Sequence, residues 1–561
     1  NTVDMINSNP YILCNEAIGI GFERADSIAS AMPNKPDDIF RIRAGILYVV
    51  THNLYNGHTC VPRDKLIEPS GELLTASSET INGAIDDLIN SRQLIEYEMG
   101  GRAFLFLPKI YFAETSAARR IKLLLKFPPA GKSTLEKDID LIEKKLKIKY
   151  AQKQREAIVT AVQRGVLILT GGPGTGKTTI LNGILELYEQ EGLNIALAAP
   201  TGRAAKRMSE VTGREAKTIH RLLEVEWDEN EHQSFSRNVS NPIDADALIV
   251  DELSMVDIQV FSALLDALPL GCRLVMVGDS DQLPPVGAGN VLHDMIDSGL
   301  LPVVELKEVF RQAMESQIVT NAHKIVSGER LDLTKKDSDF FYMERLNSQR
   351  AVATITELCT VRLPKAYGYS PISDIQVLCP SRKGELGTRN LNHALQEALN
   401  PAQKGKKEVL LNGQVFRVGD KVMQIKNNYD IPWTKGKEES TGIFNGDVGI
   451  LLDINVASAT FKIDFDERIA AYSMEGAKEL ELAYAITVHK SQGSEFDAVV
   501  MPMLNVVPQL SYRNLLYTAV TRAKNIMIIV GDENEVVKMI NNDKKTRRFS
   551  ALKEFLINDG I

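Results

Sequence analysis

Cysteine is scarce in this sequence, and its arrangement excludes the frameworks that secreted proteins use. The 561 residues include five cysteines, an odd number without a CxxC pair. The eight histidines are scattered, and none of them forms an HxxxH pair. This pattern favours free thiols in a reducing cytosol over disulfides or a zinc site. We therefore expect a cytoplasmic protein with free thiols at Cys14, Cys60, Cys272, Cys359 and Cys379.

Long hydrophobic runs and excess positive charge are lacking as well. No apolar run reaches about 18 residues, the length that a membrane-spanning helix requires, and the first residues lack a signal-peptide pattern. The formal net charge of −8 gives no support to a nucleic-acid-binding role. It does not exclude one, because a local basic groove sets the field where a nucleic acid binds. The length predicts about three to five globular domains.

Short apolar runs alternate with helical stretches in two parts of the chain. The first part spans 150–344 and contains VLILT, NIALAAP, ALIVDE and RLVMVGD. The second part spans 345–409 and 479–561 and contains DIQVLCP, AVVMPM and NIMIIVGD. Apolar runs that end in polar loops, with helices between them, are typical of parallel sheets covered by helices. The pattern predicts an α/β fold with two parallel-sheet domains.

The segments outside these two parts carry weaker signals. Residues 1–36 contain a Gly-Ile-Gly turn before a helical stretch, which fits either half of a helix-hairpin-helix or a simple glycine-rich helix start. Residues 37–126 are expected to form helices and a β-hairpin with Gly100-Gly101 as its turn, in a winged-helix-like region. Residues 127–149 combine a Pro- and Gly-rich linker with a lysine-rich helix. In 410–478, short strands with Asn-Gly and Gly-Asp turns predict a small β-barrel insertion.

A glycine-rich loop, GGPGTGKTT, directly follows the apolar run VLILT. The pattern GxxxxGK[ST] needs glycine because backbone amides wrap phosphates closely, in conformations that a Cβ would block. Lys177 supplies a point charge for the β- and γ-phosphates, the Thr178 hydroxyl reaches Mg²⁺, and the following helix directs its positive end at the phosphates. We therefore predict a Mg-ATP site formed by Gly172, Pro173, Gly174, Thr175, Gly176, Lys177, Thr178 and Thr179.

Polar residues after later apolar runs complete a hydrolytic set. Asp251 and Glu252 follow ALIV, and we expect Asp251 to hold Mg²⁺ through water and Glu252 to orient and deprotonate the attacking water. Gln282 follows RLVMVGDSD and is either a sensor of the γ-phosphate or part of a plain proline-rich turn. Arg311 and Arg522 are candidates to stabilise the charge that builds on the γ-phosphate during hydrolysis.

Taken in order, eight motifs resemble those of the superfamily one helicases. They are QREA, GGPGTGKTT, APTGRAA, VDELSM, GDSDQLPPVGAG, VFRQ, AITVHKSQGSEFD and YTAVTRAK, and they cover about 150–535. The sequences of these motifs most resemble those of the RecD-like branch, whose members move 5′ to 3′. The N-terminal segments are similar to the stand-alone bacterial RecD-like helicases rather than to the subunit of a three-protein nuclease complex. The resemblance implies an ATP-dependent DNA helicase with two RecA-like motor domains, a β-barrel insertion and a mainly helical N-terminal region.

The resemblance also assigns roles to individual segments. It implies that Gln154 binds the adenine, that 221–245 forms a β-hairpin pin that splits the duplex, and that 410–478 is a Src-homology-like barrel over the strand. For the histidines among the implied DNA contacts, a structural role is the alternative. The implied contacts to DNA are Pro200, Thr201, Gly202, Arg203, Thr218, His220, Thr487, His489, Ser491 and Gln492.

Partners and location follow from the same resemblance. It implies binding of single-stranded DNA and single-strand/duplex junctions, cooperation with a single-strand-binding protein, no membrane contact, and a monomer in the bacterial cytoplasm near the nucleoid. Two alternatives stay open: a motor subunit active only within a larger recombination or repair complex, and a nucleotide-switched DNA-binding protein that does not unwind. A conjugative relaxase fragment is disfavoured, because no histidine cluster or tyrosine-rich nuclease segment is visible.

Overall fold

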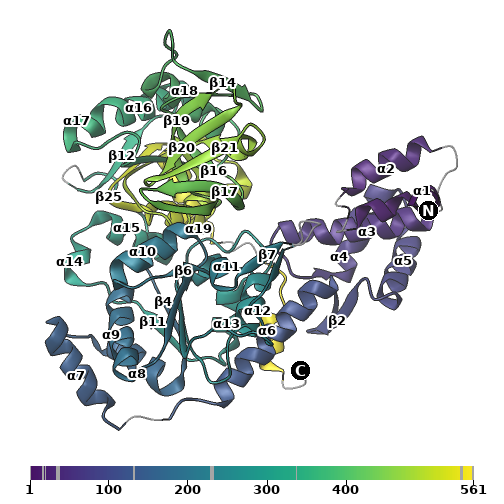
Figure 1. Ribbon diagram of the computed structural model, residues 1–561, viewed down its shortest axis with the longest axis horizontal. Coiled ribbons are helices and arrows are strands. Elements are labelled where there is room, and N and C mark those ends of the chain that lie inside the picture. The colour runs from purple at the N-terminus through teal and green to yellow at the C-terminus, as the bar shows by residue number, and fades with distance from the viewer. Residues whose placement is uncertain are drawn as a thin grey trace.

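In the computed structural model, two parallel β-sheets organise the molecule. An antiparallel sheet lies beside the second of them and a helical arm beside the first (Figure 1). The structure describes residues 2–558 except 16–17, 19, 33–37, 131–132, 228–232, 336–337, 456 and 544–547. All five cysteines are free thiols. No helix in the described part of the chain is long and apolar enough to cross a membrane.

The N-terminal arm is built from helices and one β-hairpin. Ser77 starts α5 because its side chain accepts a hydrogen bond from the Thr80 N–H at 3.2 Å. Strands β2 and β3 pair antiparallel around Gly100 and Gly101, which both have positive φ, as the Gly-Gly turn predicts. The elements of the arm are α1 (Thr2–Ser8), η1 (Pro10–Cys14), α2 (Phe22–Ala31), α3 (Asp38–Tyr55), β1 (Val61–Pro62), α4 (Arg63–Leu74), α5 (Ser78–Asn90), β2 (Ile95–Met99) and β3 (Arg102–Phe106).

Helix α6 (Pro108–Lys126) leaves the arm and packs on α12 (Ile258–Asp266) of the first sheet domain. Its apolar residues Ala117 and Ile121 are fully buried in that domain's core, and Arg120 Nε donates to the Leu265 carbonyl at 2.9 Å. The winged-helix-like region expected to extend to residue 126 is therefore shorter, because the apolar face of α6 completes the first sheet domain instead.

In the described part of the chain, six parallel strands form the first sheet in the order β11-β4-β10-β9-β5-β6. Helices cover both faces, which explains why the strands are continuous apolar runs. Because the strands are parallel, their carboxyl ends meet at one edge. The elements are α7 (Leu135–Leu146), α8 (Gln152–Arg164), β4 (Val166–Gly171), α9 (Lys177–Gln190), β5 (Ile195–Ala199), α10 (Gly202–Thr212), β6 (Lys217–Thr218), α11 (Ile219–Leu222), β7 (Val225–Trp227), β8 (Gln233–Phe235), β9 (Ala247–Val250), η2 (Leu253–Met255), α12, β10 (Arg273–Gly278), α13 (Val291–Ser298) and β11 (Val303–Leu306).

A second parallel sheet has the order β12-β25-β24-β13-β23 among the described residues. Its first strand, β12, lies before the boundary that we expected between 344 and 345. That boundary is wrong, because β12 pairs with β25 and the apolar residues Ile318 and Ile325 of α15 are buried in the second domain's core. The elements are α14 (Arg311–Met314), α15 (Gln317–Ser327), β12 (Phe340–Glu344), α16 (Ser348–Glu357), η3 (Leu358–Arg362), α17 (Leu363–Tyr367), β13 (Ile375–Cys379), α18 (Thr388–Leu399), β23 (Ala485–Thr487), η5 (Val488–Ser491), β24 (Phe496–Met503), η6 (Pro508–Leu510), α19 (Arg513–Val520), β25 (Ala523–Gly531) and α20 (Glu533–Asn541).

An antiparallel insertion interrupts the second domain between α18 and β23. Its described strands form a hairpin, β14-β15, and a sheet in the order β18-β17-β21-β20-β19-β16-β22. The elements are β14 (Glu408–Leu411), β15 (Gln414–Arg417), β16 (Lys421–Gln424), β17 (Asn428–Lys435), β18 (Glu438–Ile443), β19 (Val448–Asn455), β20 (Thr460–Phe465), β21 (Arg468–Ser473), η4 (Gly476–Glu479) and β22 (Leu480–Leu482).

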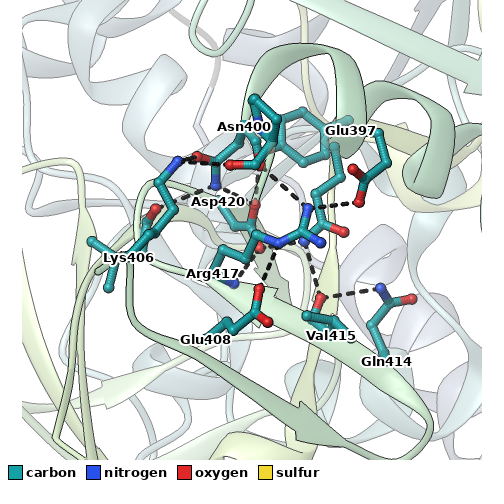
Figure 2. A network of polar contacts seen from close by, with 12 residues as sticks. Glu397, Asn400, Lys406, Glu408, Gln414, Val415, Arg417 and Asp420 are labelled. Carbon is teal, nitrogen blue, oxygen red and sulfur yellow. Dashed lines mark hydrogen bonds and ion pairs between the residues drawn. The ribbon is translucent and has the colours of Figure 1, made fainter. Parts of the chain in front are cut away.

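A buried carboxylate, Asp420, fixes the insertion to helix α18 (Figure 2). It accepts hydrogen bonds from Gln396 Nε2 at 2.6 Å and Asn400 Nδ2 at 2.7 Å, both on α18 or directly after it. It also accepts from the Arg417 N–H at 2.7 Å and the Tyr484 hydroxyl at 2.9 Å. A fully buried charge needs such compensation, so this network holds the orientation of the insertion on the second domain.

The chain ends by returning from the second sheet domain to the first. Helix α21 (Leu552–Ile557) packs on α6 and α13, and its Leu552 and Phe555 are buried in the first domain's core. The expectation that the second domain continues to residue 561 is therefore wrong for 548–558, because these apolar side chains complete the first domain. In Figure 1 the last helix, drawn in yellow, lies beside α6 and away from β25.

The Asp420 network predicts a large effect of one substitution on stability. Asp420→Ala leaves four buried donors without their shared acceptor, and we expect the unfolding free energy of the second domain to fall by at least about 3 kcal/mol. Urea denaturation followed by fluorescence measures this loss. Lys407→Ala, which breaks only the exposed ion pair with Asp453, is the control and should cost less than about 1 kcal/mol. Equal midpoints for the two variants would contradict the proposed importance of Asp420.

A buried acid beneath the C-terminal segment predicts a pH dependence of stability. Glu114 is fully buried on α6, and burial, with a smaller contribution from Asp294, raises its pKa from 4.5 to about 8. The unfolded chain ionises this carboxyl near pH 4.5 and the folded chain near pH 8, so stability falls as pH rises between these values.

We expect the melting temperature to drop by on the order of a few degrees between pH 5 and 8. Glu114→Gln, which stays neutral, should reduce that slope and leave the part that Asp294 contributes through its own raised pKa of about 7. A slope that is identical in the variant would show that Glu114 is ionised in the folded protein already at pH 5.

Candidate functional site

The glycine-rich loop lies between the end of β4 and the start of α9, at the carboxyl edge of the first sheet. Gly174 and Gly176 have positive φ values of 73° and 84°. A Cβ at Gly176 would lie 2.4 Å from Gln154 Nε2 and 2.7 Å from Phe310 Cε2. The loop therefore requires glycine both for its backbone conformation and for the close approach of its neighbours.

Lys177 starts α9, and its side chain turns back over the loop. Its Nζ donates to the carbonyl oxygens of Gly171 and, at 3.1 Å, Gly172. Thr175 Oγ1 donates to the Gly172 carbonyl at 2.8 Å and closes the turn. Thr178, one residue further along the helix, is exposed. An ammonium group, a helix N-terminus and an exposed hydroxyl thus share one site, which is the arrangement that binds phosphate groups.

Asp251 and Glu252 follow β9 and lie at the same edge of the sheet. Glu252 has a φ of 54°, an uncommon conformation for a residue other than glycine, and its N–H donates to Asp251 Oδ1 at 2.8 Å. Burial and the neighbouring Glu252 raise the pKa of Asp251 to about 6, while Lys177 and Arg207 oppose this shift. The two carboxylates thus lie at the same edge of the sheet as the glycine-rich loop, and their roles toward Mg²⁺ and water stay predictions.

Gln154 lies beside the loop on α8. Its side chain is 3% exposed, and its Oε1 accepts the Ala151 N–H at 3.0 Å. Its Nε2 has no hydrogen-bond partner among the described residues, although it is buried. A buried donor without a partner is costly, and it marks a position where a ligand can supply the missing acceptor.

The second sheet domain contributes a tyrosine to this site. Tyr517 of α19 is 1% exposed, and its hydroxyl donates to Asp279 Oδ2 at 2.6 Å across the interface between the two domains. Burial and Asp279 raise the pKa of Tyr517 well above its ordinary value. A Cβ on Gly172 would lie 3.0 Å from the Tyr517 hydroxyl oxygen. Sequence reasoning did not select Tyr517, although it belongs to the YTAVTRAK motif that carries Arg522.

The neighbouring α14–α15 segment also approaches the glycine-rich loop. His323 Nε2 on α15 lies 3.3 Å from the Pro173 carbonyl oxygen, and a Cβ on Gly174 would lie 2.7 Å from Ala313 Cβ. Sequence reasoning did not select His323, because no motif in the sequence includes it. The loop is thus enclosed by both sheet domains.

The three side chains expected near the γ-phosphate differ in position. Gln282 Nε2 donates to Asp279 Oδ2 at 3.2 Å, and its buried Oε1 has no partner among the described residues. Arg522 is 2% exposed, and its Nη1 donates to the Ser494 carbonyl at 3.2 Å. No hydrogen bond or ion pair between described residues joins Arg522 to the glycine-rich loop. Arg311 begins α14, but its side chain lies outside the described part of the structure.

A groove of about 470 Å³ runs between the two sheet domains and the insertion. We call it the interdomain groove. Its lining includes the exposed, apolar Val286 together with Met255 and Leu510. It also includes six of the ten residues for which the resemblance implies DNA contacts: Thr201, Gly202, Arg203, Thr487, His489 and Gln492.

The other four residues with implied DNA contacts lie outside this lining. Thr218 lines an adjoining pocket of about 270 Å³ together with several lysines and arginines. Ser491 is fully buried, and its hydroxyl donates to the Val488 carbonyl at 2.8 Å. His220 is near Phe235, with ring centroids 5.9 Å apart, and burial lowers its pKa. Pro200 precedes the groove at the end of β5.

Basic side chains link the edges of the interdomain groove. Arg203 Nη1 donates to Ser494 Oγ of the second domain at 3.1 Å, and burial lowers its pKa. In the adjoining pocket, Lys206 pairs with Asp466 of the insertion at 2.8 Å. The groove and this pocket together therefore gather cationic side chains despite the acidic net charge of the chain, as a local nucleic-acid site requires.

Two parallel sheets that enclose a phosphate-binding loop and share a groove define the class of two-domain nucleotide-driven motors. Comparison with known proteins agrees with this. Four family models match: an AAA domain at 154–288, an ATP-dependent RecD2 DNA helicase HHH domain at 1–60, an ATP-dependent RecD-like DNA helicase SH3 domain at 391–465, and a UvrD-like helicase C-terminal domain at 482–530. The HHH model extends beyond the segment 1–36 that the sequence indicated.

Similar proteins identify the family. The ATP-dependent RecD2 DNA helicase of Deinococcus radiodurans is 34% identical over 549 residues, which are 95% of this chain and 71% of that protein. The RecBCD enzyme subunit RecD of Mycolicibacterium smegmatis is 31% identical over 450 residues, which are 73% of this chain and 76% of that protein. A crystal structure of Bacteroides Pif1 bound to ssDNA is 18% identical with a TM-score of 0.41, and the match covers 69% of this chain and 94% of that one.

The chain belongs to the family of ATP-dependent RecD2 DNA helicases. It is an ATP-dependent DNA helicase of the RecD-like branch of superfamily one, and the resemblance drawn from the ordered motifs is confirmed.

Proposed function

We propose that this helicase moves along single-stranded DNA from 5′ to 3′, driven by Mg-ATP bound between the glycine-rich loop and the second motor domain. The observation that carries the proposal is that the glycine-rich loop and the interdomain groove both lie between the same two domains. Tyr517 and Asp279 meet beside the loop, and the interdomain groove opens between the same two domains. Closing and reopening of this interface would then move the two domains along a strand in alternation.

Lys177 and the amides of the loop would hold the phosphates, and the unpartnered Gln154 Nε2 would donate to the adenine base. Thr178 and Asp251 fit Mg²⁺, which prefers oxygen ligands and binds with few protein groups beside phosphate and water. When bound, Mg²⁺ neutralises charge on the phosphates. Glu252, placed next to Asp251 by its unusual backbone conformation, would accept the proton of the attacking water.

Gln282, Arg311 and Arg522 would respond to the γ-phosphate. For Arg522 this role requires a rotation away from the Ser494 carbonyl as the domains close. The backbone next to Gln282 reaches both other sites, because the Leu283 N–H donates to Thr518 Oγ1 at 3.0 Å and the Leu283 carbonyl accepts from Gln492 Nε2 at 3.0 Å. A change at the γ-phosphate would thereby reach the interdomain groove.

The interdomain groove would hold the strand through contacts that do not depend on base sequence. Its apolar lining suits bases, and its cationic edges suit phosphates, so we expect binding to weaken steeply with salt. Strands β7 and β8, which pair antiparallel, would form the pin at a single-strand/duplex junction, although the tip, 228–232, lies outside the described residues. Cooperation with a single-strand-binding protein, a monomeric state and a place near the nucleoid in the bacterial cytoplasm belong to the same proposal.

One experiment tests ATP use and direction together. Wild type should unwind a 5′-tailed duplex with ATP and should leave a 3′-tailed duplex intact. Lys177→Ala should lose ATPase activity and unwinding while still binding the strand, because it removes only the ammonium group that binds the phosphates. Lys538→Ala, which removes an exposed lysine paired with the half-buried Glu535 far from the loop, is the control and should behave as wild type. Unwinding by Lys177→Ala would overturn the role of the loop, and preference for the 3′ tail would overturn the direction.

The same assay separates the two alternatives, one of which has support in the RecBCD subunit among the relatives. Unwinding by the purified chain alone excludes a subunit that works only in a complex. DNA-stimulated ATPase activity without strand displacement would instead indicate a nucleotide-switched DNA-binding protein.

A further inference from the structure

The C-terminal segment 548–558, which we call the C-terminal strap, begins beside the loop 285–289 and ends in helix α21 on the first motor domain (Figure 1). Its first residue, Arg548, is bound to the loop 285–289, which belongs to the GDSDQLPPVGAG motif. Arg548 Nη2 donates to the Pro285 carbonyl at 2.6 Å. Its Nη1 donates to the carbonyls of Gly287 at 2.9 Å and Gly289 at 2.7 Å.

Two of these bonds, to Pro285 and Gly287, are on the residues either side of Val286, the residue of this loop that lines the interdomain groove. Val286 is 75% exposed, so packing of its own side chain does little to hold it in place. The loop forms no helix or strand; the guanidinium donates to three of its carbonyls, and the Ala288 carbonyl accepts the Ile258 N–H at 3.0 Å. The planar guanidinium presents its donors in a fixed fork, which a lysine cannot reproduce. Arg548 therefore fixes the backbone on both sides of Val286.

The N-terminal arm holds Arg548 in place from the other side. Gly57 has a φ of 87°, and a Cβ there would lie 2.3 Å from Arg548 Cζ, so only glycine fits against the guanidinium. The next residue of the strap is gripped as well: the Phe549 N–H donates to His58 Nδ1 at 2.9 Å, and the Phe549 carbonyl accepts the Thr59 N–H at 2.8 Å. The N-terminal arm and the C-terminal strap thus together hold Arg548 against the loop 285–289.

The rest of the strap is anchored in the first motor domain. The Ala551 N–H donates to Glu114 Oε2 at 3.1 Å, and Ser550 Oγ donates to Asp294 Oδ2 at 2.7 Å. Burial lowers the pKa of Arg548 to about 10, opposed by Tyr512, Asp294 and Asp257, so the guanidinium stays charged at neutral pH. A charge-assisted donor bound to three carbonyls is a strong, directional constraint.

We propose that Arg548 is a positioning residue for strand binding: through the carbonyls of Pro285, Gly287 and Gly289 it sets the place of Val286 in the interdomain groove. This rests on the proposed function, which makes that groove the site of single-stranded DNA. The C-terminal strap thereby links the N-terminal arm to the binding of single-stranded DNA in the interdomain groove.

The test compares ATPase stimulation by a single-stranded oligonucleotide in full-length variants. Arg548→Ala should raise the half-saturating oligonucleotide concentration by about three- to thirtyfold, with a much smaller change in the rate at saturating oligonucleotide. Arg548→Lys should be intermediate, because it keeps the charge but loses the fork. Arg330→Ala is the control: it removes an exposed arginine paired with Glu533 and should change neither quantity.

A double-mutant cycle with Val286→Ala distinguishes positioning from a general structural role. If Arg548 acts through Val286, the double variant should bind the oligonucleotide little worse than the weaker single variant. Effects that multiply, or a half-saturating concentration for Arg548→Ala equal to wild type, would overturn the proposal. If Arg548→Ala fails to fold, the cycle with Arg548→Lys decides by the same criterion. Failure of the proposed function is different, because wild type itself would then show no stimulation by the oligonucleotide.

Discussion

The hydrogen bond between Asp279 and Tyr517 is the interaction on which the arrangement of the motor depends. It joins the carboxyl edge of the first sheet to α19 of the second domain, over 2.6 Å and out of contact with water. A buried carboxylate needs donors, and Asp279 accepts from the Asp281 N–H and Gln282 Nε2 of its own domain and from the Tyr517 phenol of the other. The bond therefore fixes where the two sheets meet, and that meeting point lies beside Gly172 of the glycine-rich loop.

From this point, short connections run to both ligand sites. Gln282 shares Asp279 as its acceptor, and the backbone of Leu283 is bonded to Thr518 and to Gln492, which lines the interdomain groove. A bound nucleotide that alters the interface at Asp279 would shift these bonds as well. Coupling between the proposed ATP and strand sites would thus need no long pathway, since both lie at one interface.

Local chemistry made part of this site predictable. Glycines that need positive φ, and carboxylates that end a buried strand, leave signals within a few residues, so the loop at Gly172–Thr178 and the pair Asp251 and Glu252 could be found from the sequence. Contacts between distant segments left no such signal. The pairing of β12 with β25, and the return of 548–558 to the first domain, depend on apolar faces that look alike wherever they pack. The same limit explains why His323 was missed and why the bond of Arg522 to Ser494 was not foreseen.

The interface at Asp279 and Tyr517 is proposed to transmit the nucleotide state to the strand. Tyr517→Phe tests it most directly, because it removes only the hydroxyl and keeps the buried ring. The measurement is the Kd for a single-stranded oligonucleotide with ADP and with a non-hydrolysable ATP analogue. Wild type should show different values in the two states, and in Tyr517→Phe their ratio should fall toward one. If wild type shows clearly different Kd values in the two states and Tyr517→Phe keeps the same ratio between them, the proposal is contradicted.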